Sequence, residues 1–253
     1  APAAIRAALH RLTPDARNPA AAFAHLLERT VDRGDVAITG DVEADQQMLG
    51  EALAPLLADG VVPIVLGGGH ETSFGHFLGY AGAGKRARIL NWDAHPDVRP
   101  LPDERAHSGS PFRQALEHPS GACAGYTVAG LLPHSVSVAH LEWLREREGD
   151  WLWGSEITRE RVDALYVLAD APLMASFDMD AVDAAWAPGV SAPAIGGMEP
   201  GLWLHAAYTA GRSPHVASLD LVETNPRHDP DGRTVRLAAL TVWHFLRGLA
   251  ERG

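Results

Sequence analysis

The sequence predicts an α/β fold in which helices cover a mostly parallel β-sheet. Apolar strand-like segments alternate with amphipathic helical stretches along the chain, which is the pattern typical of α/β proteins. The strand-like segments show little polar alternation, which indicates burial on both faces of the sheet. A chain of 253 residues is long enough for one sizeable core and short for two ordinary domains. We therefore expect a single domain over residues 1–253.

The first half of the chain opens on a helical pattern, APAAIRAALHRL, and then alternates between strands and helices. No initiator methionine and no strand precede this pattern, which is compatible with a missing N-terminal strand. The glycines at 67–69 predict a turn between a strand and a helix. The predicted elements are, in order, a strand at Asp35–Thr39, a helix at Glu43–Leu57, a strand at Val61–Leu66, a helix from His70 through Leu78, a strand at Ala87–Trp92 and a helix start at PFRQALEH from Pro111.

The second half continues the alternation and closes with a helix. The predicted strands are Tyr126–Leu131, Leu173–Phe177 and Val216–Val222. The predicted helices are Ser137–Glu148, Thr158–Leu168, Gly201–Ala210 and Thr234–Glu251.

Composition excludes several classes of function. A net charge of -11 with a single lysine, Lys85, argues against binding to nucleic acid or anionic membrane surfaces. Cys123 is the only cysteine, so an internal disulfide and a thiolate zinc cluster are both impossible. The chain has no apolar run of about 20 residues and no secretory signal pattern. We expect a cytoplasmic protein with a small-molecule substrate.

Charged side chains gather directly after two predicted strands. The strand ending at Trp92 continues as DAHPD (Asp93–Asp97), and LMASF continues as Asp178-Met179-Asp180. In open parallel sheets, ligands bind at the carboxyl ends of the strands. Alternate residues of an extended chain project to one side, so the polar residues after Trp92 converge if strand geometry persists past it. Any one of these side chains taken alone could instead be a loop cap or a solvated group.

His70 is a further candidate, because it follows a turn of three glycines after the strand VVPIVL. This turn lets its side chain lean back over the edge of the sheet. The glycines could instead bind phosphate, but they lack the Lys-Ser/Thr of a P-loop and the spacing of a dinucleotide fingerprint. The candidate metal ligands are therefore His70, Asp93, His95, Asp97, Asp178 and Asp180.

This set favours two divalent cations. Its four carboxylates and two neutral imidazoles carry a formal charge of -4, which two such ions would cancel. Without metal, the carboxylates would raise one another's pKa and destabilise the site. Oxygen-rich ligands with few imidazoles and no sulfur favour Mn²⁺ over Fe²⁺, Co²⁺ or Ni²⁺. Two ions about 3.5–4 Å apart can lower the pKa of a bridging water and so create a nucleophile.

Four motifs resemble those of the ureohydrolase family of arginases, agmatinases and formimidoylglutamases. GGGHE at Gly67–Glu71, DAHPD at Asp93–Asp97 and SFDMD at Ser176–Asp180 are similar to its metal-binding signatures. DLVETNP at Asp220–Pro226 is similar to a fourth block. The resemblance covers nearly the whole chain, and it implies a three-layer α/β/α sandwich around a mostly parallel sheet and a homo-oligomer.

The resemblance also implies how two Mn²⁺ ions per chain would be held. Asp93 and Asp178 would bridge the two ions. The other four ligands would form two pairs, and each pair would complete the site of one ion. These pairs are His70 with Asp97, and His95 with Asp180.

Residues outside the metal set resemble the formimidoylglutamase branch. Arg99 stands where arginases have an asparagine, and the segments HSGSPFRQ at His107–Gln114 and APGVSAP at Ala187–Pro193 are similar to that branch. The Asp-Pro that follows the third metal motif in arginases and agmatinases is absent, since Asp183 is followed by Ala184. The implied reaction is hydrolysis of N-formimidoyl-L-glutamate to L-glutamate and formamide, a step of histidine degradation.

The same likeness implies roles for two acidic residues. Asp97 would take a proton from the attacking water and pass it to the departing amine. Glu223 would accept hydrogen bonds from the amidinium and orient it. The structural alternative for Glu223 is a partner for a helix dipole or a salt bridge.

Three residues between the predicted strands Ala87–Trp92 and Tyr126–Leu131 complete the predicted site. Arg99 would form a bidentate clamp on a substrate carboxylate, and an ion pair with a nearby acid, Asp103 or Glu104, is its structural alternative. Ser108 and His107 would add hydrogen bonds or relay a proton, and a solvated side chain is the alternative for His107.

Other functions keep the same metals or the same general architecture. A guanidine hydrolase of agmatinase or guanidino-acid type could use Arg99 for a guanidino acid. A catalytically silent metal-binding protein would bind metal without turnover. A deacetylase-like hydrolase would use one metal and a different ligand spacing. Turnover of amidine and guanidine substrates separates these functions.

Overall fold

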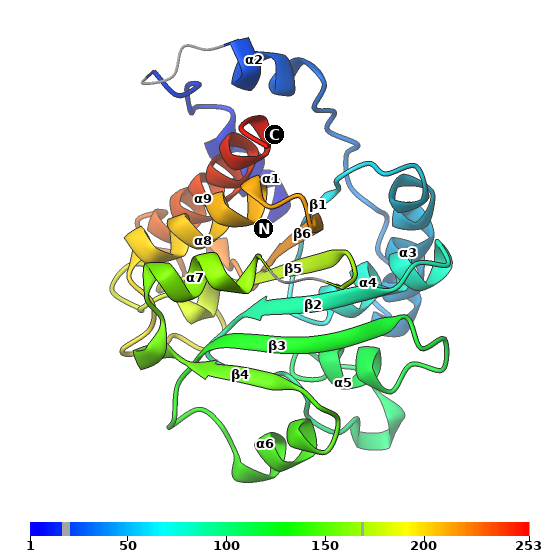
Figure 1. Ribbon diagram of the computed structural model, residues 1–253. Coiled ribbons are helices and arrows are strands. Elements are labelled where there is room, and N and C mark those ends of the chain that lie inside the picture. Colours follow the sequence, from blue (N-terminus) through cyan, green and yellow to red (C-terminus); the bar gives the residue numbers. More distant parts are fainter. Residues whose placement is uncertain (17–20, 168–169, 253) are drawn as a thin grey trace.

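The protein, described here from a computed structural model at residues 1–16, 21–167 and 170–252, is built around one β-sheet (Figure 1). The strands are β1 Ile64–Leu66, β2 Ala87–Trp92, β3 Cys123–Leu131, β4 Asp150–Trp153, β5 Leu173–Asp178 and β6 Val216–Val222. Their order in the sheet is β1-β6-β5-β2-β3-β4, and every neighbouring pair is parallel. The carboxyl ends of all six strands therefore lie at one edge of the sheet.

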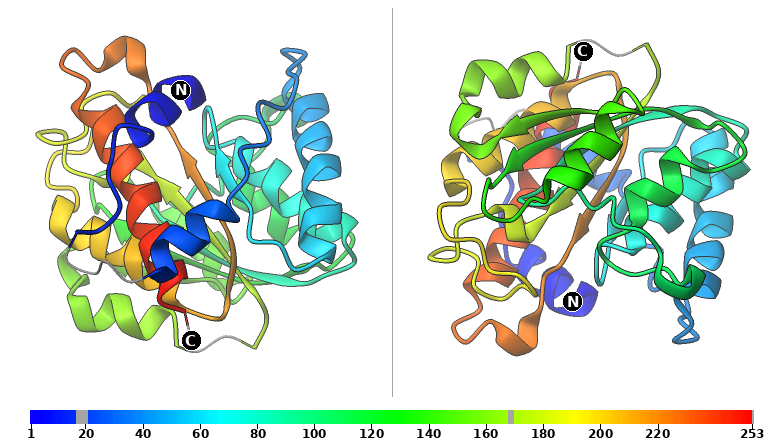
Figure 2. Two further views of the ribbon diagram at one scale, coloured as in Figure 1. Left: turned by 90° about the horizontal axis from the view of Figure 1, so that it is seen from above. Right: turned by 90° about the horizontal axis from the view of Figure 1, so that it is seen from below.

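Helices lie on both faces of this sheet. They are α1 Pro2–Leu9, α2 Ala21–Glu28, α3 Val42–Ala58, α4 Thr72–Gly82, α5 Pro111–Leu116, α6 Val138–Arg145, α7 Arg159–Leu165, α8 Pro200–Arg212 and α9 Arg233–Ala250. Figure 2 shows α1, α8 and α9 on one side of the sheet and α3 and α4 on the other. The predicted three-layer α/β/α architecture is thus confirmed.

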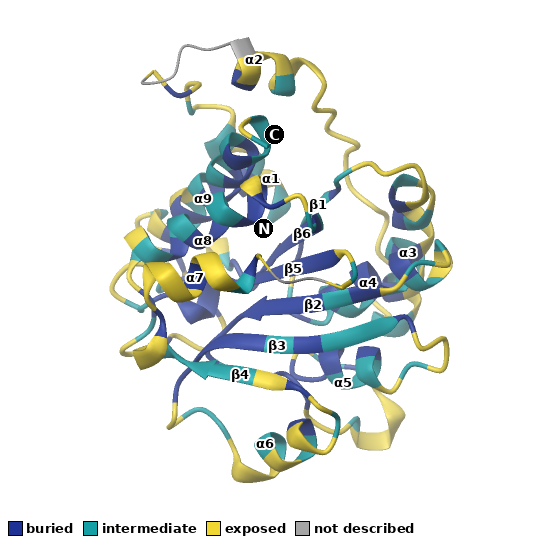
Figure 3. Ribbon diagram, in the orientation of Figure 1, coloured by how far each residue is buried: buried dark blue, intermediate teal, exposed yellow. Residues whose placement is uncertain are grey.

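Each face of the sheet has its own hydrophobic core. On one face, Trp203 of α8 packs in the same cluster as Trp92 and Phe177 of the sheet. On the other face, Phe77 of α4 and Ile89 of β2 belong to a second cluster. The central strand β5 is buried along its whole length, as Figure 3 shows. Burial on both faces explains why the strands carry apolar runs instead of an alternating pattern.

The register of the sheet brings the ends of β2 and β5 together. Trp92 of β2 pairs with Phe177 of β5, so Asp93 and Asp178 follow at adjacent positions. On the other side of β5, Asp178 pairs with Val222 of β6. The residues that follow these three strands therefore lie next to one another.

Most predicted elements are confirmed, with small differences at their ends. The strands Ala87–Trp92 and Val216–Val222 are present with the predicted bounds, and the opening helical pattern forms α1. β1 begins at Ile64 and not at Val61, because Pro63 has no backbone N–H to donate to a neighbouring strand. The edge strand β4 was not predicted. Helix α7 ends at Leu165, and the predicted end at Leu168 lies outside the described residues.

The prediction of a strand at Asp35–Thr39 is wrong. This segment is exposed and has no regular secondary structure, and Ile38 within it is 82% exposed. The backbone amides of Thr39 and Gly40 donate to the Asp45 side chain, at 2.6 and 3.2 Å, and not to a strand. A β-propensity pattern forms a strand only where a neighbouring strand and a hydrophobic face are available.

No helix within the described parts of the chain is both long enough and apolar enough to cross a membrane.

Candidate metal centre

The six predicted ligands come from three connections at the carboxyl edge of the sheet. His70 lies in the turn between β1 and α4, and Asp93, His95 and Asp97 lie in the loop after β2. Asp178 is the last residue of β5, and Asp180 lies in the short 3-10 helix Met179–Ala181 that follows. The sequence thus places all six at the edge where ligands of parallel sheets bind.

The glycine turn before His70 fits closely against the sheet. A Cβ atom at Gly67 would lie 2.8 Å from the Val222 side chain and 3.1 Å from that of Thr72. Only glycine fits this approach without displacing its neighbours, and the turn therefore brings His70 close to the end of β6.

Side chains after β2 converge through a tight loop, so the condition set in the sequence analysis, strand geometry that persists past Trp92, is not met. β2 ends at Trp92, and the backbone amide of His95 donates to Asp93 Oδ1 at 2.7 Å. Asp97 has a left-handed backbone conformation with φ 44°. An aspartate that accepts from its own backbone two residues on, followed by a left-handed residue, turns the chain so that alternate side chains face one region.

His70 and three aspartates form the first group. Its Nδ1 atom lies 3.2 Å from Asp93 Oδ2, 2.9 Å from Asp97 Oδ2 and 2.8 Å from Asp178 Oδ2. All four side chains are buried. These ligand atoms lie within 4.8 Å of one another, which is compact enough for one metal ion.

Asp93 joins this group to a second one. His95 Nδ1 lies 3.4 Å from Asp93 Oδ1 and 3.3 Å from Asp180 Oδ2. Asp93 thus presents one oxygen to each group, as expected of a bridging carboxylate. Asp178 belongs to the first group and not to the second, and its bridging role stays a prediction.

Burial and crowding perturb the carboxyl groups of this cluster. Burial, together with repulsion from Asp93, raises the pKa of Asp178 to about 7 and also raises that of Asp97. The pKa of Asp180 is raised well above its ordinary value by burial and by the charge of Asp178. Asp93 differs, because the neighbouring His70 and His95 imidazoles outweigh its burial and lower its pKa.

The two histidines respond in the opposite sense. Burial opposes protonation of His70, but the charge of Asp178 and the adjacent carboxylates raise its pKa well above its ordinary value. For His95, the contacts with Asp180 and Asp93 outweigh burial and raise the pKa to about 11. The cluster therefore attracts positive charge strongly.

This donor set fits a pair of divalent cations. Within the described residues, no lysine or arginine forms an ion pair with any of the four carboxylates. The buried His70 Nδ1 and Asp180 Oδ1 atoms also have no hydrogen-bond partner among them. Buried carboxylates without a fixed cation are costly, and divalent ions would balance this charge. Nitrogen and oxygen donors without sulfur are those that Mn²⁺ accepts.

A cavity of about 330 Å³ opens beside His95. Its other lining residues are Ala94, His134, Ser135, Ala192, Pro193, Ala194 and Ile195. This volume is suited to a small molecule, and one ligand of the second group is exposed to it.

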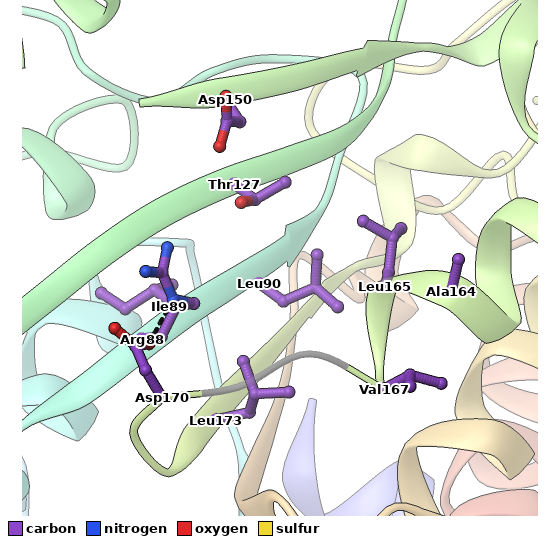
Figure 4. Close-up of a pocket in the computed structure, with 10 residues that line it drawn as sticks. All are labelled: Arg88, Ile89, Leu90, Thr127, Asp150, Ala164, Leu165, Val167, Asp170 and Leu173. Atoms are coloured by element: carbon purple, nitrogen blue, oxygen red, sulfur yellow. Dashed lines mark hydrogen bonds and ion pairs between the residues drawn. The ribbon is translucent and has the colours of Figure 1, made fainter. Parts of the chain in front are cut away.

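A larger cavity of about 670 Å³ lies elsewhere, at the amino-terminal ends of the strands. Figure 4 shows Arg88 and Leu173, which begin or nearly begin β2 and β5, together with the salt bridge between Arg88 and Asp170. None of its described lining residues belongs to the predicted site. Of these two cavities, the one beside His95 adjoins the cluster.

Glu223 lies next to the first group. It is 8% exposed and has a left-handed backbone conformation with φ 63°. Its Oε1 atom accepts from the backbone amide of His70 at 2.9 Å, and its Oε2 atom accepts from the Ser191 hydroxyl at 2.7 Å. A carboxylate can accept about four hydrogen bonds, so Glu223 retains acceptor capacity for a ligand.

Arg99 is exposed, and its guanidinium has no hydrogen bond or ion pair within the described part of the chain. Its predicted structural alternative, a pair with Asp103 or Glu104, is thus not formed. The guanidinium lies against Gly109, where a Cβ atom would be only 2.6 Å from Arg99 Nε. The backbone amide of Arg99 also donates to the Gly109 carbonyl at 2.8 Å.

The remaining predicted residues, His107 and Ser108, differ in exposure and in their hydrogen bonds. Ser108 is exposed, and no described residue bonds its hydroxyl. His107 is half-buried, with Nε2 3.1 Å from the Pro100 carbonyl and Nδ1 accepting from the Gly109 amide at 3.1 Å. In this conformation both ring nitrogens of His107 are occupied within the loop, and its proposed relay role would require the ring to turn.

Two polar residues that sequence analysis did not select line the cavity. His134 and Ser135 lie in the segment after β3, at the same edge of the sheet as the ligands. The rule that selected Asp93 after β2 would have selected them too, had it been applied to the segment after Leu131. Ser191, the partner of Glu223, does not follow a strand, and sequence analysis included it only as part of the segment Ala187–Pro193.

Comparisons with known proteins agree with this geometry. The family model described as "Arginase family" matches residues 1–247. The formimidoylglutamase of Rhodococcus opacus (strain B4) is 40% identical over 245 residues, which cover 89% of this chain and 75% of the relative. The formimidoylglutamase of Geobacillus thermodenitrificans (strain NG80-2) is 38% identical over 262 residues, covering 98% and 78%.

Solved structures show the same fold. The crystal structure of Trypanosoma cruzi formiminoglutamase with Mn²⁺ has a TM-score of 0.86 and 31% identity, covering 100% of this chain and 86% of that one. Formimidoylglutamase from Bacillus subtilis has a TM-score of 0.88 and 26% identity, covering 99% and 81%.

Proposed function

Because this chain belongs to the arginase family of metallohydrolases that act on C–N bonds of linear amidines, we propose that it hydrolyses N-formimidoyl-L-glutamate. The products would be L-glutamate and formamide. The observation that carries the proposal is the pair of His/Asp groups that share Asp93 beside a cavity of about 330 Å³.

The residues that would hold two Mn²⁺ ions are the six of the cluster. They are His70, Asp93, His95, Asp97, Asp178 and Asp180. When bound, the ions would supply Lewis acidity and lower the pKa of water at the site.

Asp97 is suited to moving a proton. It is buried, and without metal, burial with repulsion from Asp93 raises its pKa. A carboxylate of this kind can take the proton of an attacking water and return it to the departing glutamate nitrogen. The left-handed backbone at Asp97 fixes where this side chain points.

Glu223 would orient the substrate. The Ser191 hydroxyl and the His70 amide hold its carboxylate in place, and its remaining lone pairs can accept from the N–H groups of an amidinium. Its negative charge also complements the positive charge of that group.

Arg99 provides the argument for a substrate with carboxylates. Its guanidinium has no partner among the described residues, and it lies two residues after Asp97. The pKa of His140 is lowered chiefly by burial. The charge of Arg99 lowers this pKa further, and the charge of Asp97 raises it. A guanidinium in this region can bind a carboxylate in a bidentate manner.

Turnover of a panel of substrates tests the proposal. The Mn²⁺-loaded protein would be assayed with N-formimidoyl-L-glutamate, arginine, agmatine and guanidinobutyrate at equal concentrations. We expect release of formamide from the first and much slower release of urea from the others. Preferential hydrolysis of guanidinobutyrate or agmatine would instead assign the chain to the guanidine hydrolases, and metal binding without any turnover would indicate a silent binding protein.

A further inference from the structure

A row of buried polar side chains leads from the candidate metal centre into the core. His70 Nε2, the ring nitrogen that faces away from the ligand carboxylates, lies 3.0 Å from Ser176 Oγ of β5. The Ser176 hydroxyl donates to Asp220 Oδ1 of β6 at 2.7 Å. All three residues are 0% exposed, so water does not compete for these hydrogen bonds.

Asp220, in strand β6, is held from its other side by His76 of helix α4. Its Oδ2 atom lies 2.7 Å from His76 Nδ1. His76 Nε2 lies 2.7 Å from Ser218 Oγ, which is in turn 2.6 Å from the Tyr80 hydroxyl. These groups are also 0% exposed. A fully buried carboxylate is costly unless it is paired and hydrogen-bonded, and Asp220 has one partner on each oxygen.

Directions of the hydrogen bonds follow from what each group can do. An ionised carboxylate only accepts, so both Ser176 and His76 donate to Asp220. The proton of the Ser176 hydroxyl is thereby directed at Asp220, and the Ser176 oxygen is left to accept. It can accept from His70 Nε2 and from the Ser73 hydroxyl, which lies 3.2 Å away. The His70 ring then carries its hydrogen on Nε2 and keeps a lone pair on Nδ1.

We propose that Asp220, acting through the Ser176 hydroxyl, is a positioning residue that keeps His70 in the tautomer able to bind metal through Nδ1. This inference rests on the proposed metal centre, because it assigns no metal ligand of its own. Partners of this kind fix the ring orientation and tautomer of a ligating histidine.

Replacing Asp220 by asparagine would disturb this order. An asparagine has one accepting and one donating end. If its oxygen accepts from His76, its amide group faces Ser176, and the Ser176 proton must turn away. That proton can then reach His70 Nε2 and favour the tautomer in which Nδ1 carries hydrogen. The Nδ1 lone pair would no longer be available to a cation.

Binding of Mn²⁺ to the metal-free protein, followed by calorimetry, tests this proposal without measuring turnover. Asp220→Asn and Ser176→Ala should each weaken the binding of Mn²⁺ about 10- to 100-fold. The double variant should be little weaker than Ser176→Ala alone, because Asp220 acts on His70 only through that hydroxyl. If Asp220→Asn does not fold, the loss in Ser176→Ala decides the question.

Thr241→Val is the matched control. The Thr241 hydroxyl is buried and accepts from Trp203 Nε1 at 2.8 Å, on the other face of the sheet and without contact to the cluster. This variant should lose thermal stability and keep the affinity of the wild type for Mn²⁺. Equal affinity in the wild type and Ser176→Ala, or additive losses in the double variant, would overturn the positioning role. A wild type that binds no Mn²⁺ would instead refute the proposed function.

Discussion

Arg99 is the residue on which the proposed substrate depends most. The six cluster residues suit any amidine or guanidine hydrolysis, whereas a guanidinium without a partner among the described residues suits a substrate with a carboxylate. Its position next to Gly109 shows that the loop after β2 and the segment before α5 together determine where it lies.

Arg99→Met should raise KM for N-formimidoyl-L-glutamate much more than it changes folding. A lost hydrogen bond to a charged group costs roughly 1.5–3 kcal/mol, which corresponds to about a 10- to 150-fold increase in KM. Steady-state kinetics measures this change. Arg86→Met, at the opposite end of β2 on an exposed arginine, is the control and should leave KM unchanged. An unchanged KM in Arg99→Met would place the carboxylate elsewhere.

Gly109→Ala tests the same contact from the other side. The added methyl group would lie 2.6 Å from Arg99 Nε, so the guanidinium must move while the backbone stays unstrained. We expect KM to rise by about the amount of one weakened hydrogen bond, roughly tenfold, with little change in the free energy of unfolding. Gly201→Ala, where a Cβ atom has no neighbour within 4 Å, is the control. Equal kinetics in both variants would contradict the role of this contact.

At the scale of elements, the helix α9 depends on a buried aspartate outside its first turn. The two Asp229 carboxylate oxygens accept from the backbone amides of Thr234 at 3.1 Å and Val235 at 2.9 Å. These amides have no partner inside the helix, so Asp229 serves as its cap. The helix in turn packs on α8 and α1 in the larger core.

Asp229→Ala should lower the free energy of unfolding by about 1–2 kcal/mol, because two amides lose their acceptor. Urea denaturation monitored by circular dichroism measures this change. Asp59→Ala, an exposed residue just after α3, should change it by less than about 0.5 kcal/mol. Similar losses in the two variants would show that the cap contributes little.

The strands in the interior of the sheet could be predicted from the sequence, and of the two edge strands, β1 could be predicted and β4 could not. β2, β5 and β6 lie in the interior of the sheet, and continuous apolar runs mark them clearly. β4 is a four-residue edge strand, DWLW, which is too short for a period to be recognised. The segment 35–39 has the composition of a strand, but no partner within the described residues pairs with it.

Some features of the candidate site could likewise be predicted from the sequence, and others could not. The metal-ligand candidates could be selected because each follows a predicted strand, and that rule depends only on chain order. Their convergence could not be derived from strand geometry, since it depends on the left-handed backbone of Asp97. The tertiary partners of Asp220 could not be predicted either. His76 lies 144 residues away in the chain, and the sequence alone gives no sign of this pairing.

At the scale of the whole molecule, the cluster joins three connections of the sheet at one point. Without metal, burial and repulsion from Asp93 raise the pKa of Asp178 to about 7. Burial opposes protonation of His95, but Asp180 and Asp93 raise its pKa to about 11. Both pKa values are above the ordinary ones. Each group therefore contributes stability that is complete below its ordinary pKa and is lost as the pH rises through the folded-state value.

Removal of metal should thus destabilise the molecule, and more so at high pH. The melting temperature of protein treated with EDTA should fall between about pH 6 and about pH 9, and the gap to the Mn²⁺-loaded protein should widen, because metal replaces protons at the cluster. Differential scanning calorimetry at several pH values measures the melting temperatures of the EDTA-treated and the Mn²⁺-loaded protein, and hence the gap between them. A gap that stays constant or narrows as the pH rises would contradict this account of the cluster.

The most direct measurement of the central claim is a titration of metal-free protein with Mn²⁺, in which bound metal and hydrolysis of N-formimidoyl-L-glutamate are followed on the same sample. We expect formamide release to rise with bound metal and to reach its plateau at about two ions per chain. Asp178→Ala should lose both signals together. Full hydrolysis without metal, or saturation with Mn²⁺ without hydrolysis, would contradict the claim.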